Sequence, residues 1–194
     1  MQKLDAAQLM SLEQYARERP SLRAGMIEHR RARRLTIGEH CTWSFEDRRT
    51  VHYQVQEMLR SERIFESEAI AEELETYNPL IPDGNNLKAT LMIEYADPDE
   101  RARSLAELRG FERHCWMRVA GFAPVYAIAD EDLVRENETK TSAVHFLRFD
   151  FPAAMIGAAR EGAALSAGVD HPAYRHSVDP LPEALRRELL ADFG

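Results

Sequence analysis

The stretch "LKATLMIEY", residues 87 to 95, carries the clearest secondary-structure signal in this sequence. Its apolar and mixed positions alternate: Leu87, Ala89, Leu91, Ile93 and Tyr95 fall on one face, and Lys88, Thr90, Met92 and Glu94 on the other. A period of two residues is that of a β-strand, whose successive side chains point to opposite faces of a sheet. We therefore expect a strand with one face in the core and one in a mixed environment.

Similar patterns predict further strands on both sides of this stretch. They are "LTIGEHCTWSF" (35–45), "HCWMRV" (114–119), "VYAIAD" (125–130), "SAVHFLRFDF" (142–151) and "AALSAGVD" (163–170). Several are joined by turns too short for a parallel crossover, so the pairing is expected to be antiparallel. Helical patterns lie at both ends and in the middle. The predicted fold is α+β, a single domain with a largely antiparallel sheet of about six strands.

The helical segments can be placed from their starts and stops. Apolar residues at helical spacing over 8–19 are followed by Pro20, and Ser21 can cap a second helix through about Arg34, which predicts an N-terminal helical hairpin over about 8–34. The remaining 35–194 is the predicted mixed core. Middle helices are expected after Asp47, Ser67 and Asp97, and a C-terminal helix after Pro182.

Composition limits the classes of function. The chain has 33 acidic and 25 basic residues, and this excess of negative charge disfavours binding to nucleic acid or to an anionic membrane. There is no apolar run of about 18 residues, so no membrane span is expected. Charges near the start interrupt any signal-peptide core, which predicts a cytoplasmic protein. Cys41 and Cys115 show no metal or disulfide spacing, and the sequence leaves open whether they are close together.

One basic run stands against the acidic balance. "HRRARR" (29–34) contains Arg30, Arg31, Arg33 and Arg34, which are candidates for binding an anion or an acidic partner. The alternative is that these cations complement the negative end of a helix dipole and solvate one face. Arg148, on the opposite strand face from His145, is a further anion-binding candidate, or a clamp on Glu94.

Four residues are candidates for a metal site, although the sequence has no GxSxG, P-loop, GxGxxG or HExxH motif. His145 lies on the most apolar strand face, where a buried imidazole needs partners. Asp170 and His171 leave the last predicted strand in "DHPAY" (170–174). In "QVQEMLRSER" (54–63), helical spacing puts Glu62 on the face of Val55.

Two histidines with a carboxylate are ligands used by iron, zinc or manganese centres, so these four residues predict a metal site. A structural reading stays open for each of them. His145 can be a hydrogen-bonded core histidine, Asp170 can cap a turn, and Glu62 can reach water from the helix end.

The ordered segments "FEDRRTVHYQVQEMLRSERI", "EELETYNPLIP", "LKATLMIEY", "SAVHFLRF" and "VDHPAY" resemble the bacterial family DUF3501 almost from end to end. The resemblance implies a genomic context: members are often encoded beside a rubrerythrin-like protein and an iron–sulfur oxidoreductase subunit. It implies no catalytic residue. The leading hypothesis is a soluble accessory or interaction protein that acts with enzymes of redox or peroxide metabolism. The alternative is a metal-binding protein or metal-dependent enzyme.

Overall fold

The computed structural model describes residues 2–129 and 140–194, and within them the chain is an α+β protein, as predicted. The α-helices are α1 (Leu12–Ala32), α2 (Arg48–Glu62), α3 (Ser67–Tyr77), α4 (Pro98–Glu107), α5 (Ala153–Arg160) and α6 (Glu183–Leu190), with short 3-10 helices η1 (Ala6–Gln8), η2 (Asn78–Leu80) and η3 (Phe111–His114). The strands are β1 (Arg34–Ile37), β2 (Cys41–Glu46), β3 (Asn86–Ile93), β4 (Cys115–Val119), β5 (Val125–Tyr126), β6 (Ile128–Ala129), β7 (Val144–Asp150), β8 (Leu165–His171) and β9 (Tyr174–Val178). No helix of the described part is long and apolar enough to cross a membrane.

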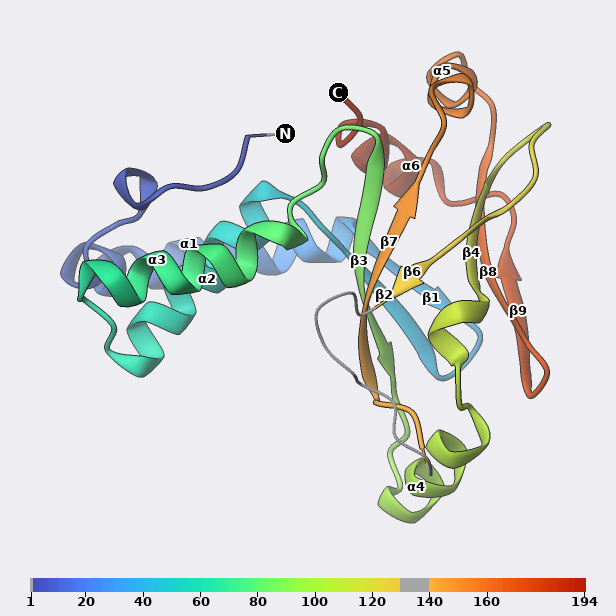
Figure 1. The fold of residues 1–194 in the computed structure, drawn as a ribbon, viewed down its shortest axis with the longest axis horizontal. Coiled ribbons are helices and arrows are strands. Elements are labelled where there is room, and N and C mark those ends of the chain that lie inside the picture. Colours follow the sequence, from blue (N-terminus) through green and yellow to red (C-terminus); the bar gives the residue numbers. More distant parts are fainter. Residues whose placement is uncertain (1, 130–139) are drawn as a thin grey trace.

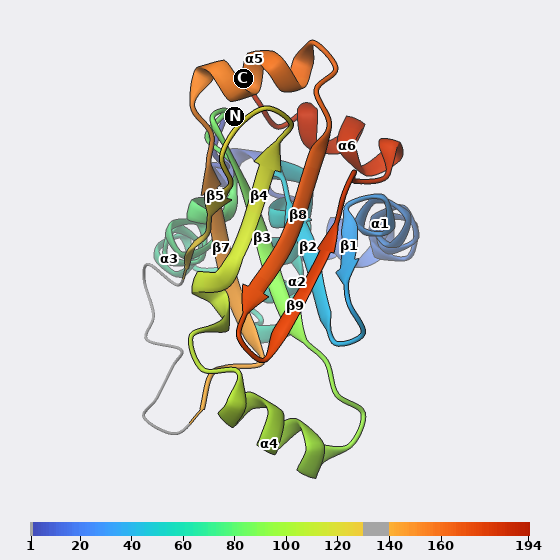
Figure 2. The same cartoon turned by 90° about the vertical axis from the view of Figure 1, so that its right-hand side faces the viewer.

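The strands form two antiparallel sheets rather than one sheet of about six strands. Their orders are β1-β2-β3-β7-β6 and β5-β4-β8-β9. The predicted strand at 87–95 is β3, at the centre of the larger sheet, where Leu91 pairs with Trp43 on one side and His145 on the other. Figure 2 shows the smaller sheet in front of the larger one, with α5 and α4 at opposite ends. The inward apolar faces of the two sheets make one core.

The two sheets are joined at both edges. Along one edge the chain runs from β5 in the smaller sheet directly into β6 in the larger one. At the other edge the Tyr174 hydroxyl donates to the Ile37 carbonyl (2.7 Å) and accepts from the His40 amide (3.1 Å). Gly38 makes this approach possible: its φ is +68°, and a Cβ there would lie 2.4 Å from the Tyr174 hydroxyl oxygen.

Both cysteines are free and buried in the core, and burial raises the pKa of the Cys41 thiol to about 12.

The predicted helical hairpin at 8–34 is wrong, because α1 is one helix of 21 residues with Pro20 inside it. An internal proline removes a helix hydrogen bond and costs roughly 3 kcal/mol. Contacts with α2 offset this cost. Arg19 donates two hydrogen bonds to the Glu57 carboxylate (2.7 and 2.8 Å), and the Tyr15 hydroxyl donates a third (2.5 Å). The hydrogen bond from Arg19 lowers the pKa of the Glu57 carboxyl to about 2, although partial burial opposes this shift.

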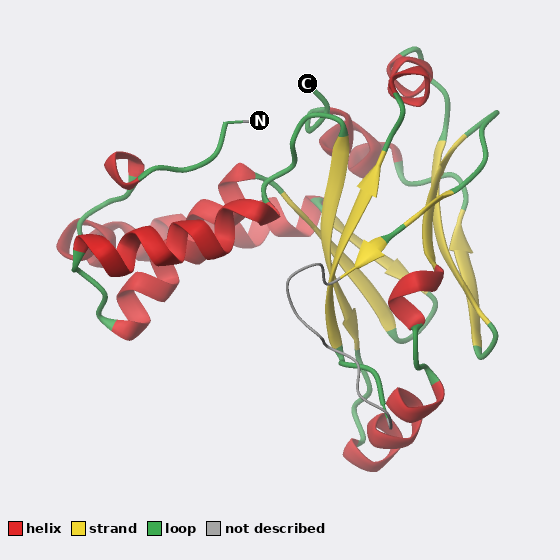
Figure 3. Cartoon of the chain, viewed as in Figure 1, coloured by secondary structure: helices red, strands yellow, loops and turns green. Residues whose placement is uncertain are grey.

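The helices α1, α2 and α3 form an arm that projects away from the sheets (Figures 1 and 3). The arm has its own apolar cluster, separate from the core between the sheets: Leu4, Val51, Val55, Leu59, Leu74 and Ile81. The N-terminal segment is fastened to it by two side-chain amides. Asn78 exchanges hydrogen bonds with the Leu4 backbone (2.8 and 2.9 Å), and the buried Gln56 does the same with Met10 (2.6 and 3.4 Å).

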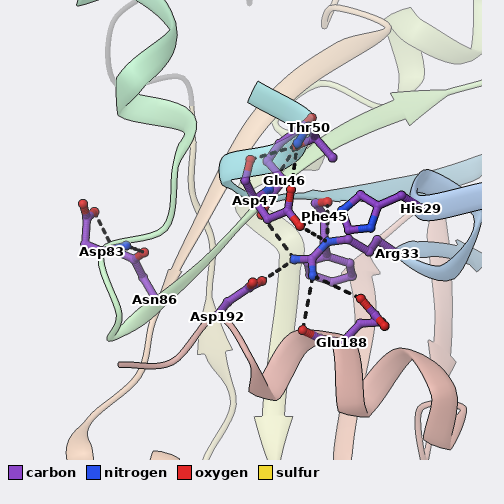
Figure 4. Close-up of polar contacts among 10 residues, drawn as sticks. All are labelled: His29, Arg33, Phe45, Glu46, Asp47, Thr50, Asp83, Asn86, Glu188 and Asp192. Carbon is purple, nitrogen blue, oxygen red and sulfur yellow. Dashed lines mark hydrogen bonds and ion pairs between the residues drawn. The ribbon is translucent and has the colours of Figure 1, made fainter. Parts of the chain in front are cut away.

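Arg33, at the end of α1, joins the arm to the sheets (Figure 4). Its side chain is 2% exposed and ion-pairs with Asp192, beyond α6, while its Nε lies 3.6 Å from the Asp47 carboxylate. The guanidinium also donates to the backbone carbonyls of Phe45 (3.2 Å), Glu46 (3.3 Å) and Glu188 (3.2 Å). Asp47 in turn caps α2 and lies 2.7 Å from His29 Nε2. Arg33 is therefore a buried structural cation, and its predicted role in anion or partner binding is wrong.

Burial of the ion pair is unfavourable for the carboxylate of Asp192. Burial raises the pKa of its carboxyl to about 6, and the attraction and hydrogen bond of Arg33 only partly oppose that shift. Removing a carboxylate from water thus outweighs the gain from its ion pair, as is common for buried pairs. The Arg33–Asp192 pair therefore fixes the position of α1 relative to the C-terminal residues more than it adds to the free energy of unfolding.

The first prediction concerns Arg33→Met. We expect the free energy of unfolding, measured by urea denaturation, to fall by about 3 kcal/mol, because the variant leaves the Asp192 carboxylate buried without its cation. The control is Arg34→Met, which removes the neighbouring guanidinium, 52% exposed, and should change stability by about 0.5 kcal/mol or less. Equal losses in the two variants would contradict a structural role specific to Arg33.

The second prediction concerns pH. The folded-state pKa of Asp192, about 6, is above its ordinary value of 3.8, so the stability that this group contributes is fully present below pH 3.8 and is lost as pH rises through 6. The free energy of unfolding of the wild type, relative to Asp192→Asn, should therefore fall by about 2 kcal/mol between about pH 4 and pH 7. Urea titrations at several pH values measure this difference. A pH-independent difference would contradict the assigned pKa.

Candidate functional site

His145 is a buried structural histidine in β7. It is fully buried, and its Nε2 lies 2.8 Å from the Thr141 hydroxyl and 3.0 Å from the Ser142 carbonyl. The Glu112 carboxylate, also buried, lies 3.9 Å from the same nitrogen. The partners that a buried imidazole requires are thus supplied by the protein on this side of the ring.

His171 is satisfied by main-chain neighbours at both ring nitrogens. The Ala173 amide donates to Nδ1 (3.2 Å), which requires the proton to be on Nε2. Nε2 then donates to the Arg109 carbonyl (3.1 Å). A neutral imidazole held in this way has no lone pair free for a metal.

Glu62 ends α2 and is exposed, at the end of the arm away from the sheets (Figure 1). It is therefore remote from the strands that carry His145 and His171. Within residues 2–129 and 140–194, no three His, Cys, Asp or Glu side chains are grouped to hold a metal ion. The described structure does not assemble the four predicted ligands into a metal centre.

The remaining basic candidates have separate surroundings. Arg30 lies over the ring of Tyr53, 5.8 Å from its centre, and Arg31 is exposed. Arg34 pairs with Glu94 (3.3 Å), the residue that one of the two alternatives for Arg148 had as its partner. Arg148 instead pairs with Asp150 on its own strand. Partner binding by the exposed Arg30 and Arg31 stays a prediction.

Asp170 is the predicted residue around which polar side chains do gather. It lies in β8, on the outer face of the smaller sheet. Tyr126 donates its hydroxyl to one carboxylate oxygen (2.6 Å), and His114 Nδ1 lies 3.1 Å from the other. The three residues come from β5, η3 and β8, and the His114 ring also packs edge-on against His171, 5.0 Å between centres. We call Asp170, His114 and Tyr126 the Asp170 cluster.

The ionisation of the Asp170 cluster follows from these hydrogen bonds. Burial alone would raise the pKa of the Asp170 carboxyl, but the hydrogen bonds from Tyr126 and His114 lower it overall. The same hydrogen bond raises the pKa of the Tyr126 hydroxyl, with smaller effects from burial and from the charge of Asp170. Asp170 is thus an ionised acceptor that holds a phenol and an imidazole in place.

A pocket opens beside this cluster. Its volume is about 450 Å³, and its lining residues are Trp116, Val169, Asp170, Arg175, His176 and Ser177. Strand register puts Tyr126, Trp116, Gly168 and Ser177 in one row across four strands, with Asp170 opposite Arg175 in the next. An aromatic ring, a cation and a hydroxyl therefore converge in a hollow that can accept a small molecule.

Sequence reasoning found Asp170 but missed its neighbours. Trp116, His114, Tyr126 and Arg175 lie on short strands or their flanks, and each by itself is ordinary. A usable signal was the alternation in "HCWMRV": Cys115 and Met117 are the inward residues, so Trp116 must point outward from a sheet face. A tryptophan that points outward from a sheet places a large apolar ring at the surface, which is a signal of a binding site.

The chain is similar to a protein family and to a solved structure, both of which are described as being of unknown function. The model of the family DUF3501, described as a protein of unknown function, matches residues 3–193. A crystal structure of a novel protein of unknown function from Burkholderia pseudomallei is similar over 100% of both chains, with 45% sequence identity and a TM-score of 0.94. No curated protein matches this sequence.

The third prediction tests the Asp170 cluster. In Asp170→Asn the Tyr126 pKa should move down towards its ordinary value of 10, because the charged acceptor that raises it is gone. Ultraviolet titration of phenolate formation measures this, with Tyr126→Phe variants of both proteins subtracted to isolate Tyr126 from the other tyrosines. An unchanged Tyr126 titration in Asp170→Asn would contradict the hydrogen bond.

Proposed function

We propose that this chain, which belongs to the DUF3501 family of proteins of unknown function, is an accessory protein that docks onto a partner enzyme. The docking surface is the end of the helical arm, from Glu62 to Glu73, which we call the arm end. The partner is an enzyme of redox or peroxide metabolism, and docking takes place in the cytoplasm.

Phe65 is the observation that carries the proposal. It lies in the connection between α2 and α3, and its side chain is 70% exposed, more than any other large apolar side chain of the described residues. Leaving an aromatic ring in water forgoes roughly 2 kcal/mol of burial. Aromatic side chains in this setting are common anchors of protein interfaces, where a partner pocket encloses them.

The charges around Phe65 indicate the kind of partner. Glu62, Glu66 and Glu68 are exposed around it, and Arg63 is the only cation between Glu62 and Glu73. The pKa of the Glu73 carboxyl is raised, first by partial burial and then by the negative charges of Glu62 and Glu72. This repulsion is relieved when a cationic surface approaches. A partner with an apolar pocket rimmed by lysines or arginines therefore fits the arm end.

The architecture supports docking at this place. The arm projects from the sheets, so the arm end can enter a concave surface without a clash from the sheets (Figure 1). Its rigidity comes from the internal apolar cluster and from the Glu57 contacts of Tyr15 and Arg19, so little order has to be gained on binding. The family resemblance suggests rubrerythrin-like and iron–sulfur oxidoreductase proteins as the partners to test first.

The fourth prediction is that tagged wild-type protein recovers a rubrerythrin-like or iron–sulfur protein from cells, and that Phe65→Ser reduces the affinity of the purified pair roughly 30-fold, as expected for loss of an aromatic anchor. Binding should weaken with salt, and more steeply for wild type than for Glu62→Lys/Glu66→Lys, because the charge complementarity is screened.

Ile27→Ser is the matched control, since Ile27 is also exposed (56%) but lies in the last turns of α1, near the sheets. It should bind as wild type does. Recovery of neither partner class, or equal binding by Phe65→Ser and wild type, would overturn the proposal.

A further inference from the structure

The pocket on the smaller sheet is independent of the arm end and has the make-up of a small-molecule site. It opens on the outer face formed by β4, β8 and β9, the face turned towards the viewer in Figure 2. Its volume of about 450 Å³ falls within the usual range of ligand sites. Its side chains indicate the chemical class of ligand that it binds.

Trp116 supplies a flat apolar surface because of the glycine beside it. Gly168 pairs with Trp116 across β4 and β8, and a Cβ at Gly168 would lie 2.5 Å from the indole Cζ2 and 2.7 Å from Cε2. Only glycine therefore allows the indole to lie this close to the sheet. The Arg118 guanidinium carbon lies 5.7 Å from the ring centre, and its ion pair with Asp179 (2.6 Å) holds it there. A ring in this position is a platform for stacking another ring.

Arg175 supplies a guanidinium whose donors are unused in the part of the chain that the structure describes. It lies directly opposite Asp170 in the register of β8 and β9, yet it forms no ion pair or hydrogen bond with any residue that the structure describes. The reason is that the two Asp170 oxygens accept from Tyr126 and His114 on the other side of β8. The carboxylate is thus engaged by Tyr126 and His114, and the Arg175 guanidinium keeps its donors for a ligand.

We propose that this pocket binds a small planar aromatic compound carrying an anionic group, with its ring on Trp116 and its anionic group on Arg175. A guanidinium fits carboxylate and phosphate groups through paired hydrogen bonds. The exposed Ser177 hydroxyl lines the same hollow and adds a donor for the anionic group. The net charge of −8 opposes a long polyanion, so the ligand is a small molecule.

The test uses the indole N–H signals of the labelled protein in NMR titrations. The chain has two tryptophans, and Trp43 is fully buried in the core, so its signal reports whether each variant is folded. Four probes separate the requirements: adenosine monophosphate and 2-naphthoate have both a ring and an anion, adenosine has only the ring, and inorganic phosphate only the anion. The first two should shift the Trp116 signal with dissociation constants of about 1 mM or below, and each of the others should bind at least roughly tenfold more weakly.

The two complete probes carry a phosphate and a carboxylate on different rings, and the tighter of the two is used with the variants. Arg175→Ala should weaken that probe roughly tenfold or more, whereas Arg34→Ala, an exposed arginine on β1, should not. Gly168→Ala should displace the indole and weaken all ring-bearing probes while the Trp43 signal stays in place. The proposal is overturned if neither complete probe shifts Trp116, if adenosine binds as tightly as adenosine monophosphate, or if Arg175→Ala binds as wild type does.

Discussion

The buried guanidinium of Arg33 is the constraint on which the arrangement of the arm and the sheets depends. A positive charge with 2% exposure requires partners on every side, and here they come from β2, from the start of α2 and from the C-terminal residues around α6. A different placement of any of these segments would leave the charge unpaired, at a cost of several kcal/mol. The pair with Asp192 thus selects one orientation of the arm, even though burial of the carboxylate offsets much of the energy gained.

The same requirement for partners explains why two predicted metal ligands, His145 and His171, are engaged by other groups of the protein. His145 and His171 are buried or nearly so, and their nitrogens are engaged by Thr141, Ser142, Arg109 and Ala173. Polar residues on apolar faces attract attention in a sequence because they are unusual there. Burial makes their partners obligatory, and the nearest partners in a folded chain are backbone groups and hydroxyls.

The two surfaces left for function differ in chemistry and in place. The arm end offers an exposed aromatic ring among negative charges, which suits a large basic partner. The pocket on the smaller sheet offers an aromatic ring beside a positive charge, which suits a small anion. Because the arm and this sheet are built on separate apolar clusters, either surface can be altered without removing the core beneath the other. Docking and ligand binding can therefore be tested separately.

The sequence by itself determined the α+β class, the strand at the centre of the larger sheet, and helix starts such as the Asp47 and Asp97 caps, since each depends on periodicity or hydrogen bonds within a few residues. Tertiary structure decided the continuity of α1 through Pro20, the division of the strands into two sheets and the burial of Arg33. It also placed Tyr126 and His114 on Asp170, and Trp116 over Gly168. These features depend on contacts between distant residues, such as Arg33 and Asp192, 159 positions apart. Periodicity tells which face of an element is apolar, but not which other element will cover it.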